Sequence, residues 1–153
     1  MTRLVIALAV IGIAIVIAVI VQRRRAFDPP TQPRQWSVPL QLDRDDFPHV
    51  DKPWLVAVFT SATCESCARA TAKARVLESG EVGYVEVPYQ QRKDLHERYG
   101  IDVVPCILMA GVDGTVSASF VGVPTATDLW AAAAEARQPG VSPEPDLGRP
   151  EAP

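Results

Sequence analysis

The pattern of hydrophobic and polar positions divides the chain into three parts. Residues 4–21 form an apolar run without a charge, whereas residues 139–153 are rich in Pro and hold almost no large apolar side chain. Between them, from residue 36 to residue 138, short apolar stretches alternate with charged ones. This pattern is typical of one small globular domain, with a membrane-length segment before it and a disordered tail, 139–153, after it.

The first apolar run predicts a transmembrane helix. As a helix, residues 4–21 would rise about 27 Å, close to the roughly 30 Å hydrocarbon thickness of a bilayer. A helix buried in a soluble core would carry a polar face over that length, and this run has none. A signal peptide, the alternative, has small residues at its cleavage site, whereas Arg23–Arg25 follow here. We therefore expect residues 1–25 to be an uncleaved anchor with a basic flank.

Positive charges flank the apolar run unequally. Arg3 and the terminal amine precede it, while Arg23–Arg25 follow it, with Arg34 further on. Because the more positive side of a span stays in the cytoplasm, we expect a single-pass protein of the cell membrane whose soluble domain is cytoplasmic. An extracytoplasmic domain is the open alternative. Residues 26–35 carry three prolines and predict a stiff, extended linker between the anchor and the domain.

Apolar periodicity in the central part predicts alternating strands and helices. A near-continuous apolar run after Pro53 is typical of a strand buried on both faces. Gly80 and Gly100 follow helical patterns, as helix stops do, and Asp113-Gly114 predicts a hairpin turn. We expect strands at 54–60, 82–87, 106–110 and 116–122, and helices at 65–79, 92–100 and 125–137. This order predicts an α/β sandwich with parallel and antiparallel pairs in one mixed sheet.

The segment before the first long strand has a weaker pattern. Residues 36–42 alternate, and Pro39 would interrupt a central strand, so we expect an edge strand there and a loop at 43–53. Trp54 and Trp130 are expected to pack in or beside the core.

Composition narrows the classes of function. The net charge is −3 at pH 7, and no basic stripe runs through the central part, so we expect no nucleic-acid partner. Three cysteines are too few to scaffold a disulfide-rich domain. Two of them, Cys64 and Cys67, stand two residues apart, directly after the first predicted strand of the domain.

These two cysteines are placed for redox chemistry. Cys64 lies where a strand gives way to a helix, whose first turn presents unpaired N–H groups and the positive end of the dipole, and both favour a thiolate. Cys67 is one helical turn further on, within bonding reach. In such a pair Cys64 attacks a partner disulfide, and Cys67 resolves the mixed disulfide. Two alternatives stay open: buried cysteines without a role, and a zinc site, for which Cys106, His49 and His96 are the other soft ligands.

From Trp54 to Arg137 the chain resembles the thioredoxin superfamily. The matching segments are the strand "WLVAVFTSATC", the "CESC" pair, "DLHERYGIDVVP", the hairpin turn "GVDGT", and "FVG" before the last helix. The resemblance implies a thioredoxin-like three-layer sandwich, thiol–disulfide exchange with dithiol or disulfide proteins as partners, and no cofactor. It also implies that Pro105 is cis, faces the CxxC pair and binds the partner's backbone, with Val104 beside it. An ordinary trans proline at a strand start is the alternative.

The chain departs from the family's usual pattern around the cysteines. Thr63 stands where thioredoxins have Trp, and Glu65-Ser66 stand where they have Gly-Pro. We include Thr63 among the candidate contacts to the partner. The negative charge of Glu65 opposes the helix dipole and tends to raise the pKa of the Cys64 thiol, which favours a reductant over an oxidant.

Three more positions carry predictions. Val58 occupies the place of the family's buried Asp, and Glu86 falls on the neighbouring strand, so Glu86 is a candidate proton acceptor for Cys67; a solvent-facing glutamate is the alternative. Cys106 is expected to be a small buried residue or a third redox-active thiol, and His96 to face solvent.

The sequence therefore predicts a membrane-anchored thiol–disulfide oxidoreductase with Cys64, Cys67 and Glu86 as catalytic residues. One alternative is a thioredoxin-fold binding module in which the cysteines are incidental. Another is an extracytoplasmic protein that acts in disulfide formation or cytochrome maturation.

Overall fold

The computed structural model describes residues 36–141 and 147–149. The elements are η1 (Arg44–Asp46), β1 (Trp54–Thr60), α2 (Cys67–Arg75), β2 (Val82–Pro88), α3 (Lys93–Arg98), β3 (Cys106–Ala110), β4 (Val116–Val121) and α4 (Ala126–Arg137). The predicted anchor (1–25) and linker (26–35) lie outside the described residues. Within the described part, no helix combines the length and the apolarity that crossing a bilayer requires.

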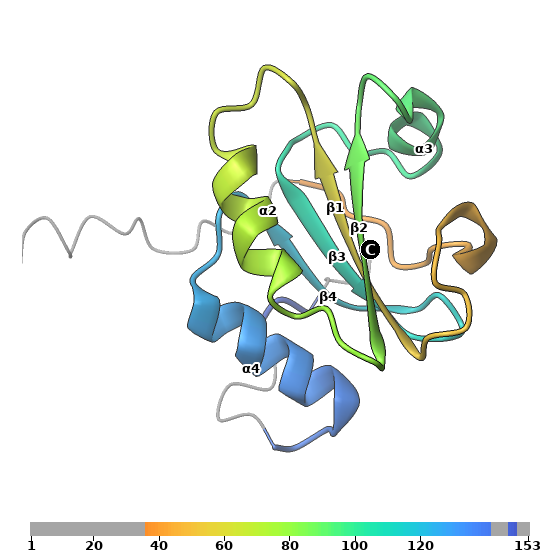
Figure 1. Cartoon of the computed structure of the whole chain (residues 1–153), viewed down its shortest axis with the longest axis vertical. Coiled ribbons are helices and arrows are strands. Elements are labelled where there is room, and N and C mark those ends of the chain that lie inside the picture. The colour runs from red at the N-terminus through yellow and green to blue at the C-terminus, as the bar shows by residue number, and fades with distance from the viewer. Residues whose placement is uncertain (1–35, 142–146, 150–153) are drawn as a thin grey trace, which may run out of the picture. The chain divides into compact units, whose positions relative to one another are not determined.

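Four strands form one mixed sheet, in the order β2-β1-β3-β4. β2 runs parallel to β1, whereas β1 with β3 and β3 with β4 are antiparallel, which confirms the predicted mixed α/β sheet (Figure 1). β1 lies between two other strands, and every residue from Leu55 to Thr60 is buried. The near-continuous apolar run predicted this position, because an inner strand with both faces covered exposes no side chain to water.

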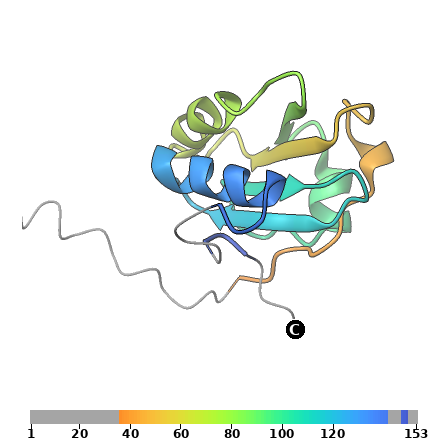
Figure 2. The ribbon, with the colours of Figure 1, turned by 90° about the horizontal axis from the view of Figure 1, so that it is seen from below.

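The side chains of β1 alternate between two hydrophobic cores. Val56 and Val58 pack with residues of α2 and α4. Leu55, Ala57 and Phe59 point to the opposite face and pack with residues of α3 and of the segment before β1. Because successive residues of a strand face opposite sides, one strand serves both cores. The result is the predicted three-layer arrangement, with α2 and α4 together on one face of the sheet (Figure 2).

Each α-helix lies within its predicted range and is shorter than predicted; α2 ends at Arg75 and not at Ser79. α2 begins at Cys67 and not at Glu65, because the residues before it form a turn in which Cys67 N–H bonds Cys64 O at 3.3 Å. α4 begins with a capping box in which Thr125 and Asp128 each accept a hydrogen bond from the other's backbone N–H. Such a box satisfies two N–H groups at the helix start that otherwise lack partners.

The segment before β1 differs from its prediction. Residues 36–42 form no edge strand; Gln41 makes one isolated antiparallel bridge to Thr115, and Leu40 O accepts a hydrogen bond from Val116 N–H at 2.9 Å. Pro39 supplies no N–H to continue a ladder there. The predicted loop at 43–53 contains the 3₁₀ helix η1.

Arg44 of η1 connects the segment before β1 to the turn between β3 and β4. Its buried guanidinium donates hydrogen bonds to the backbone oxygens of Gly111 at 2.8 Å, of His49 at 2.9 Å and of Lys52 at 2.9 Å. Burial lowers the pKa of this guanidinium from its ordinary value, and the charge of Asp51 acts in the opposite direction. Three carbonyl acceptors are what makes the burial of this positive charge tolerable.

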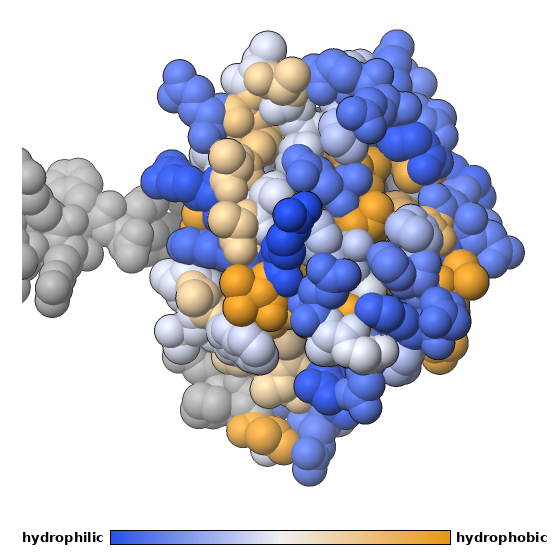
Figure 3. All heavy atoms as spheres, in the orientation of Figure 1, coloured by the Kyte–Doolittle hydropathy of each residue, from blue (hydrophilic) through white to orange (hydrophobic). Residues whose placement is uncertain are grey.

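The two tryptophans have different surroundings. Trp54 is half-buried and packs against the core under α2 and α4, as predicted. The prediction for Trp130 is wrong, because its side chain is 53% exposed on α4. Leu129, Ala132 and Ala133 make the buried side of α4 instead. Figure 3, in the orientation of Figure 1, shows a mainly hydrophilic surface with a band of apolar residues over α2.

Candidate active site

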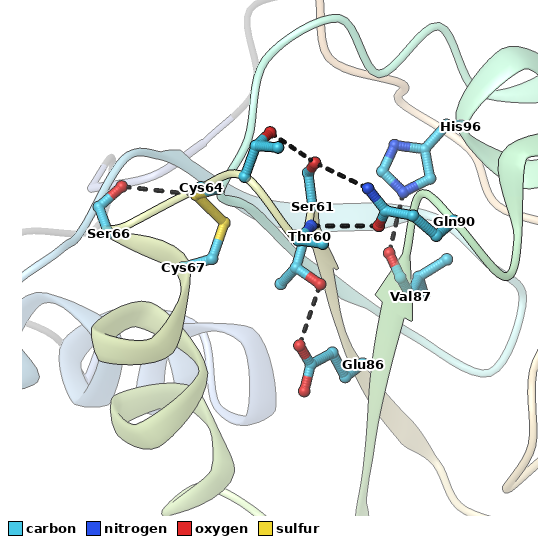
Figure 4. The surroundings of a disulfide bond; sticks show 11 residues. Thr60, Ser61, Cys64, Ser66, Cys67, Glu86, Val87, Gln90 and His96 are labelled. Atoms are coloured by element: carbon cyan, nitrogen blue, oxygen red, sulfur yellow. Dashed lines mark hydrogen bonds between the residues drawn. A yellow bond between two sulfur atoms is a disulfide. The ribbon is translucent and has the colours of Figure 1, made fainter.

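Cys64 and Cys67 form a disulfide at the point where the loop after β1 enters α2 (Figure 4). The two Cα atoms are 5.4 Å apart. Cys64 N–H bonds Ser61 O at 3.1 Å, so the loop turns back on itself before the helix begins. Cys64 is half-buried, whereas Cys67 is 4% exposed. Cys64 is therefore the more accessible of the two cysteines to an incoming thiolate.

The loop that carries Cys64 is held by the loop after β2. Tyr89 N–H bonds Thr60 O at 2.8 Å, which extends the β1–β2 pairing by one hydrogen bond. Gln90 then accepts a hydrogen bond from Ala62 N–H at 3.1 Å and donates one to Ser61 Oγ at 3.3 Å (Figure 4). No local pattern in the sequence points to Gln90, because its partners lie 28 and 29 residues away in the chain.

Ser66 contacts the sulfur of Cys64. Its Oγ lies 3.6 Å from Cys64 Sγ (Figure 4). Ser66 also occupies the N-cap position of α2, but its side chain makes no capping hydrogen bond there. In the sequence Ser66 stands out only as a departure from Gly-Pro, and its hydroxyl is the one signal there of a contact to sulfur.

Glu86 and Val58 pair across the β1–β2 ladder, so both side chains lie on the face of the sheet that α2 covers. Glu86 is exposed, on the outer strand of the sheet. Its Oε1 accepts a hydrogen bond from Thr60 Oγ at 3.0 Å (Figure 4). Thr60 is buried and two residues beyond Val58 on the same face. The carboxylate is thus turned toward the end of β1 from which the cysteine loop leaves.

Of the three residues predicted to contact the partner, Val104 and Pro105 lie directly before β3, and Thr63 lies in the cysteine loop. The bond between Val104 and Pro105 is cis, as predicted. Pro105 is buried, Val104 is half-buried, and β3 begins directly after them with Cys106 paired to Phe59 near the end of β1. Thr63 is exposed, next to Cys64. The β1–β3 register puts the cis-proline at the same end of the sheet as the cysteine loop, because Phe59 is five residues before Cys64.

Cys106 lies on the other side of the sheet from Cys67. Its side chain packs in the core beneath α3, with Phe59 and Leu95, whereas α2 covers the opposite face. It is 1% exposed and makes no disulfide. Burial raises the pKa of the Cys106 thiol to about 12. This environment fits the predicted small buried residue and disfavours a third reactive thiol.

The prediction that His96 faces solvent is wrong. His96 is 3% exposed, and its Nε2 hydrogen-bonds Val87 O at 2.8 Å (Figure 4). Its ring lies edge-on to Phe59 and to Tyr89. Among residues 36–141 and 147–149, no three His, Cys, Asp or Glu side chains gather as a metal site would need.

Comparisons with known proteins bear on the fold. No protein-family profile and no curated protein matches the chain. A solved malarial protein is 15% identical, with a TM-score of 0.50, over 55% of this chain and 97% of its own. Thioredoxin-2, a component of the malaria parasite protein secretion machinery, is 15% identical, with a TM-score of 0.50, over 54% and 82%. Thioredoxin f2 of Chlamydomonas reinhardtii is 26% identical, with a TM-score of 0.49, over 66% and 97%.

The likeness to thioredoxin-2 extends over about half of this chain and most of that protein. At 15% identity it shows the fold and nothing finer. Together with the strand order, the two covering layers and the cis-proline, it shows that the described domain has a thioredoxin-like fold with a CxxC disulfide at the start of its first α-helix.

Proposed function

We propose that this chain catalyses thiol–disulfide exchange, with Cys64 as the nucleophile and Cys67 as the resolving thiol. The observation that carries the proposal is the unequal burial of the two cysteines of one disulfide: Cys64 is half-buried at the helix start and Cys67 is buried. A dithiol partner attacks Cys64 Sγ, which frees Cys67 as a thiol. The partner's second thiol then displaces Cys64, so the partner leaves as a disulfide and Cys64–Cys67 as a dithiol. No cofactor enters this exchange.

The reverse cycle reduces a partner disulfide, and we propose this reducing direction as the physiological one. Glu65 supports it, because an exposed negative charge next to Cys64 disfavours the thiolate and so favours giving electrons away.

Reduction of insulin disulfides, with dithiothreitol as the electron source, tests the function. The full chain is expected to accelerate the precipitation of insulin, and Cys64→Ser is expected to abolish that acceleration. Cys106→Ser is the matched control, because it also removes one thiol but lies on the other face of the sheet. A wild-type chain without activity would contradict the proposal and favour a thioredoxin-fold binding module in which the cysteines are incidental.

We further propose that Glu86 accepts the proton of Cys67 during the exchange. The hydrogen bond from Thr60 Oγ at 3.0 Å supports this role, since it orients the carboxylate near the end of β1. Glu86→Gln keeps the acceptor oxygen but cannot take up a proton. It is expected to change the pH dependence of Cys67 alkylation in reduced protein; an unchanged pH profile would contradict the role.

Pro105, Val104 and Thr63 are proposed to contact the partner. The cis bond and the position of Pro105 directly before the start of β3 support a backbone contact of the kind that an added strand makes. Thr63 is exposed beside Cys64, where it would meet the partner's residues around its disulfide. Pro105→Ala is expected to raise KM for a protein disulfide more than it lowers the rate with dithiothreitol; equal effects on both would contradict a contact to the partner.

Membrane tethering is proposed on the apolar run at residues 4–21 and the arginines Arg23–Arg25 that follow it. The full chain is expected to sediment with membranes and to resist extraction at alkaline pH, and loss of residues 1–25 is expected to release it. With the domain in the cytoplasm, a membrane-impermeant thiol reagent should label Cys64 in permeabilised cells only. Labelling in intact cells would place the domain outside and favour the extracytoplasmic alternative.

A further inference from the structure

Ser66 holds the N-cap position of α2 without acting as a cap. A capping serine has extended backbone angles and accepts a hydrogen bond from an N–H in the first helical turn. Ser66 instead has φ −81° and ψ −16°, in the helical region, and its side chain makes no capping bond. The helix start is secured by the backbone, because Ser66 O accepts hydrogen bonds from Arg69 N–H and Ala70 N–H, each at 3.2 Å. The hydroxyl is therefore free of a structural task in the helix.

That hydroxyl lies 3.6 Å from Cys64 Sγ, within the distance at which a hydroxyl donates to sulfur. The sulfur of a disulfide is a weak acceptor, whereas a thiolate carries a full charge and accepts strongly. The same contact is therefore worth more in the reduced protein than in the disulfide form. A contact that strengthens on reduction shifts the redox equilibrium toward the dithiol.

We propose that Ser66 Oγ–H donates a hydrogen bond to the Cys64 thiolate and so sets the reduction potential of the pair. The proposal rests on the thiol–disulfide exchange proposed above. A dithiol partner reduces the Cys64–Cys67 bond, and the products are the partner's disulfide, the Cys64 thiolate, the Cys67 thiol and one proton. Ser66 stabilises the thiolate that this step forms, and in the reverse direction it stabilises the same thiolate as the nucleophile that attacks a partner disulfide.

The two residues between the cysteines then act in opposite senses. Glu65 is exposed, and its negative charge disfavours the Cys64 thiolate through solvent. Ser66 is half-buried and stabilises the same thiolate by direct contact. The loss of the Ser66 hydroxyl and the loss of the Glu65 charge are therefore expected to shift the potential in opposite directions.

The test measures the redox equilibrium directly. The full chain in detergent micelles is equilibrated with mixtures of reduced and oxidised glutathione, quenched with acid, and alkylated to count free thiols. Ser66→Ala is expected to shift the equilibrium about three- to tenfold toward the disulfide, which is about 15 to 30 mV for a two-electron couple. Ser66→Thr keeps a hydroxyl and is expected to stay near the wild-type value. Ser117→Ala is the control: it removes a hydroxyl of β4 that donates to Met109 O of β3, and it is expected to change nothing.

Urea unfolding of both redox forms separates this role from a structural one. Ser66→Ala is expected to lower the stability of the reduced form and to leave that of the disulfide form unchanged. Equal losses in both forms, an equilibrium equal to that of the wild type, or equal shifts in Ser66→Ala and Ser66→Thr would each overturn the proposal. These measurements need no catalysis. If the wild-type chain reduces insulin but Ser66→Ala has the wild-type redox equilibrium, only the role of Ser66 is contradicted. If the redox equilibrium of Ser66→Ala is shifted but the wild-type chain does not reduce insulin, only the proposed function is contradicted.

Discussion

The three cysteines differ in burial, and burial separates their chemistry. Cys64 is half-buried at the loop, Cys67 is covered at the start of α2, and Cys106 lies in the core on the opposite face of the sheet. A thiol reacts as its thiolate, so the raised pKa of Cys106, about 12, leaves it protonated at neutral pH.

Cys106 is therefore expected to resist thiol reagents in the folded protein. After reduction at neutral pH, a maleimide should label Cys64 first, Cys67 more slowly because it is buried, and Cys106 only after unfolding in guanidinium. Mass spectrometry of the labelled chain counts the adducts, and the Cys106→Ser variant should give the same number in both states. A third adduct in the native protein would show that Cys106 is accessible.

Sequence patterns identified the redox pair because its signal is local: two cysteines at one spacing, between a strand and a helix. They failed for His96, whose environment is made by distant residues. α3 is short, so its pattern does not fix which side faces the sheet. Contacts from distant residues decide which side of α3 faces the sheet: Val87 O, which His96 bonds, and the rings of Phe59 and Tyr89. For the same reason the hydroxyl of Ser66 and the amide of Gln90 gained a role only once their partners were placed.

At the scale of elements, β1 and β2 together present the cysteine loop. Their parallel pairing runs from Trp54–Val82 to Thr60–Pro88, and each strand then ends in a loop at the same edge of the sheet. Gln90 joins these two loops through Ala62 and Ser61. The entry to α2 is thus fixed to β2 as well as to its own strand.

Loss of this bridge is expected to loosen the cysteine loop without unfolding the sheet. Gln90→Ala leaves Ala62 N–H to bond with water, so we expect a loss of stability of about 1 kcal/mol or less, as for an exposed hydrogen bond. Amide exchange at Ala62 should become faster than in the wild type. Gln91→Ala is the matched control, since the next glutamine makes neither of these two bonds, and it should leave Ala62 exchange unchanged. Equal exchange in all three proteins would mean that the bridge does not restrain the loop.

The sequence pattern predicted every strand of the sheet, because each is a short apolar run that ends at turn residues. It was wrong for residues 36–42, where the alternation is genuine but Pro39 lacks an N–H and only Gln41 bridges to Thr115. Within the predicted tail at 139–153, Gly148 O accepts a hydrogen bond from Ser119 N–H of β4. Nothing in the composition of that stretch indicates such a contact.

At the scale of the whole molecule, the segment before β1 is joined to α3 by a polar cluster. Arg98 forms ion pairs with Asp43 at 3.2 Å and with Asp46 at 2.9 Å, and Tyr99 donates a hydrogen bond to Asp46. Tyr99 also stacks on Phe47. These contacts join residues more than fifty positions apart, so they add to tertiary stability and not to any one element.

Tyr99 is expected to make stability fall at high pH. Burial, and then the hydrogen bond to Asp46, raise its pKa to about 12, above the value near 10 of an unfolded tyrosine. The stability that this shift represents is fully present below about pH 10 and is lost as the pH rises through about 12. Urea unfolding between pH 9 and 12 should show a shallower decline for Tyr99→Phe than for the wild type. Parallel declines would show that Tyr99 does not titrate differently in the folded chain.

The buried guanidinium of Arg44 has a consequence for where the domain can be divided. The motifs shared with thioredoxins begin at Trp54, yet Arg44 supplies hydrogen bonds to Gly111 O in the turn between β3 and β4. A fragment cut at Trp54 would also lose Leu42 and Phe47 from the core beneath α3. We therefore expect the smallest piece that folds to be longer than the piece that the motifs delimit and to include Leu42, Arg44 and Phe47.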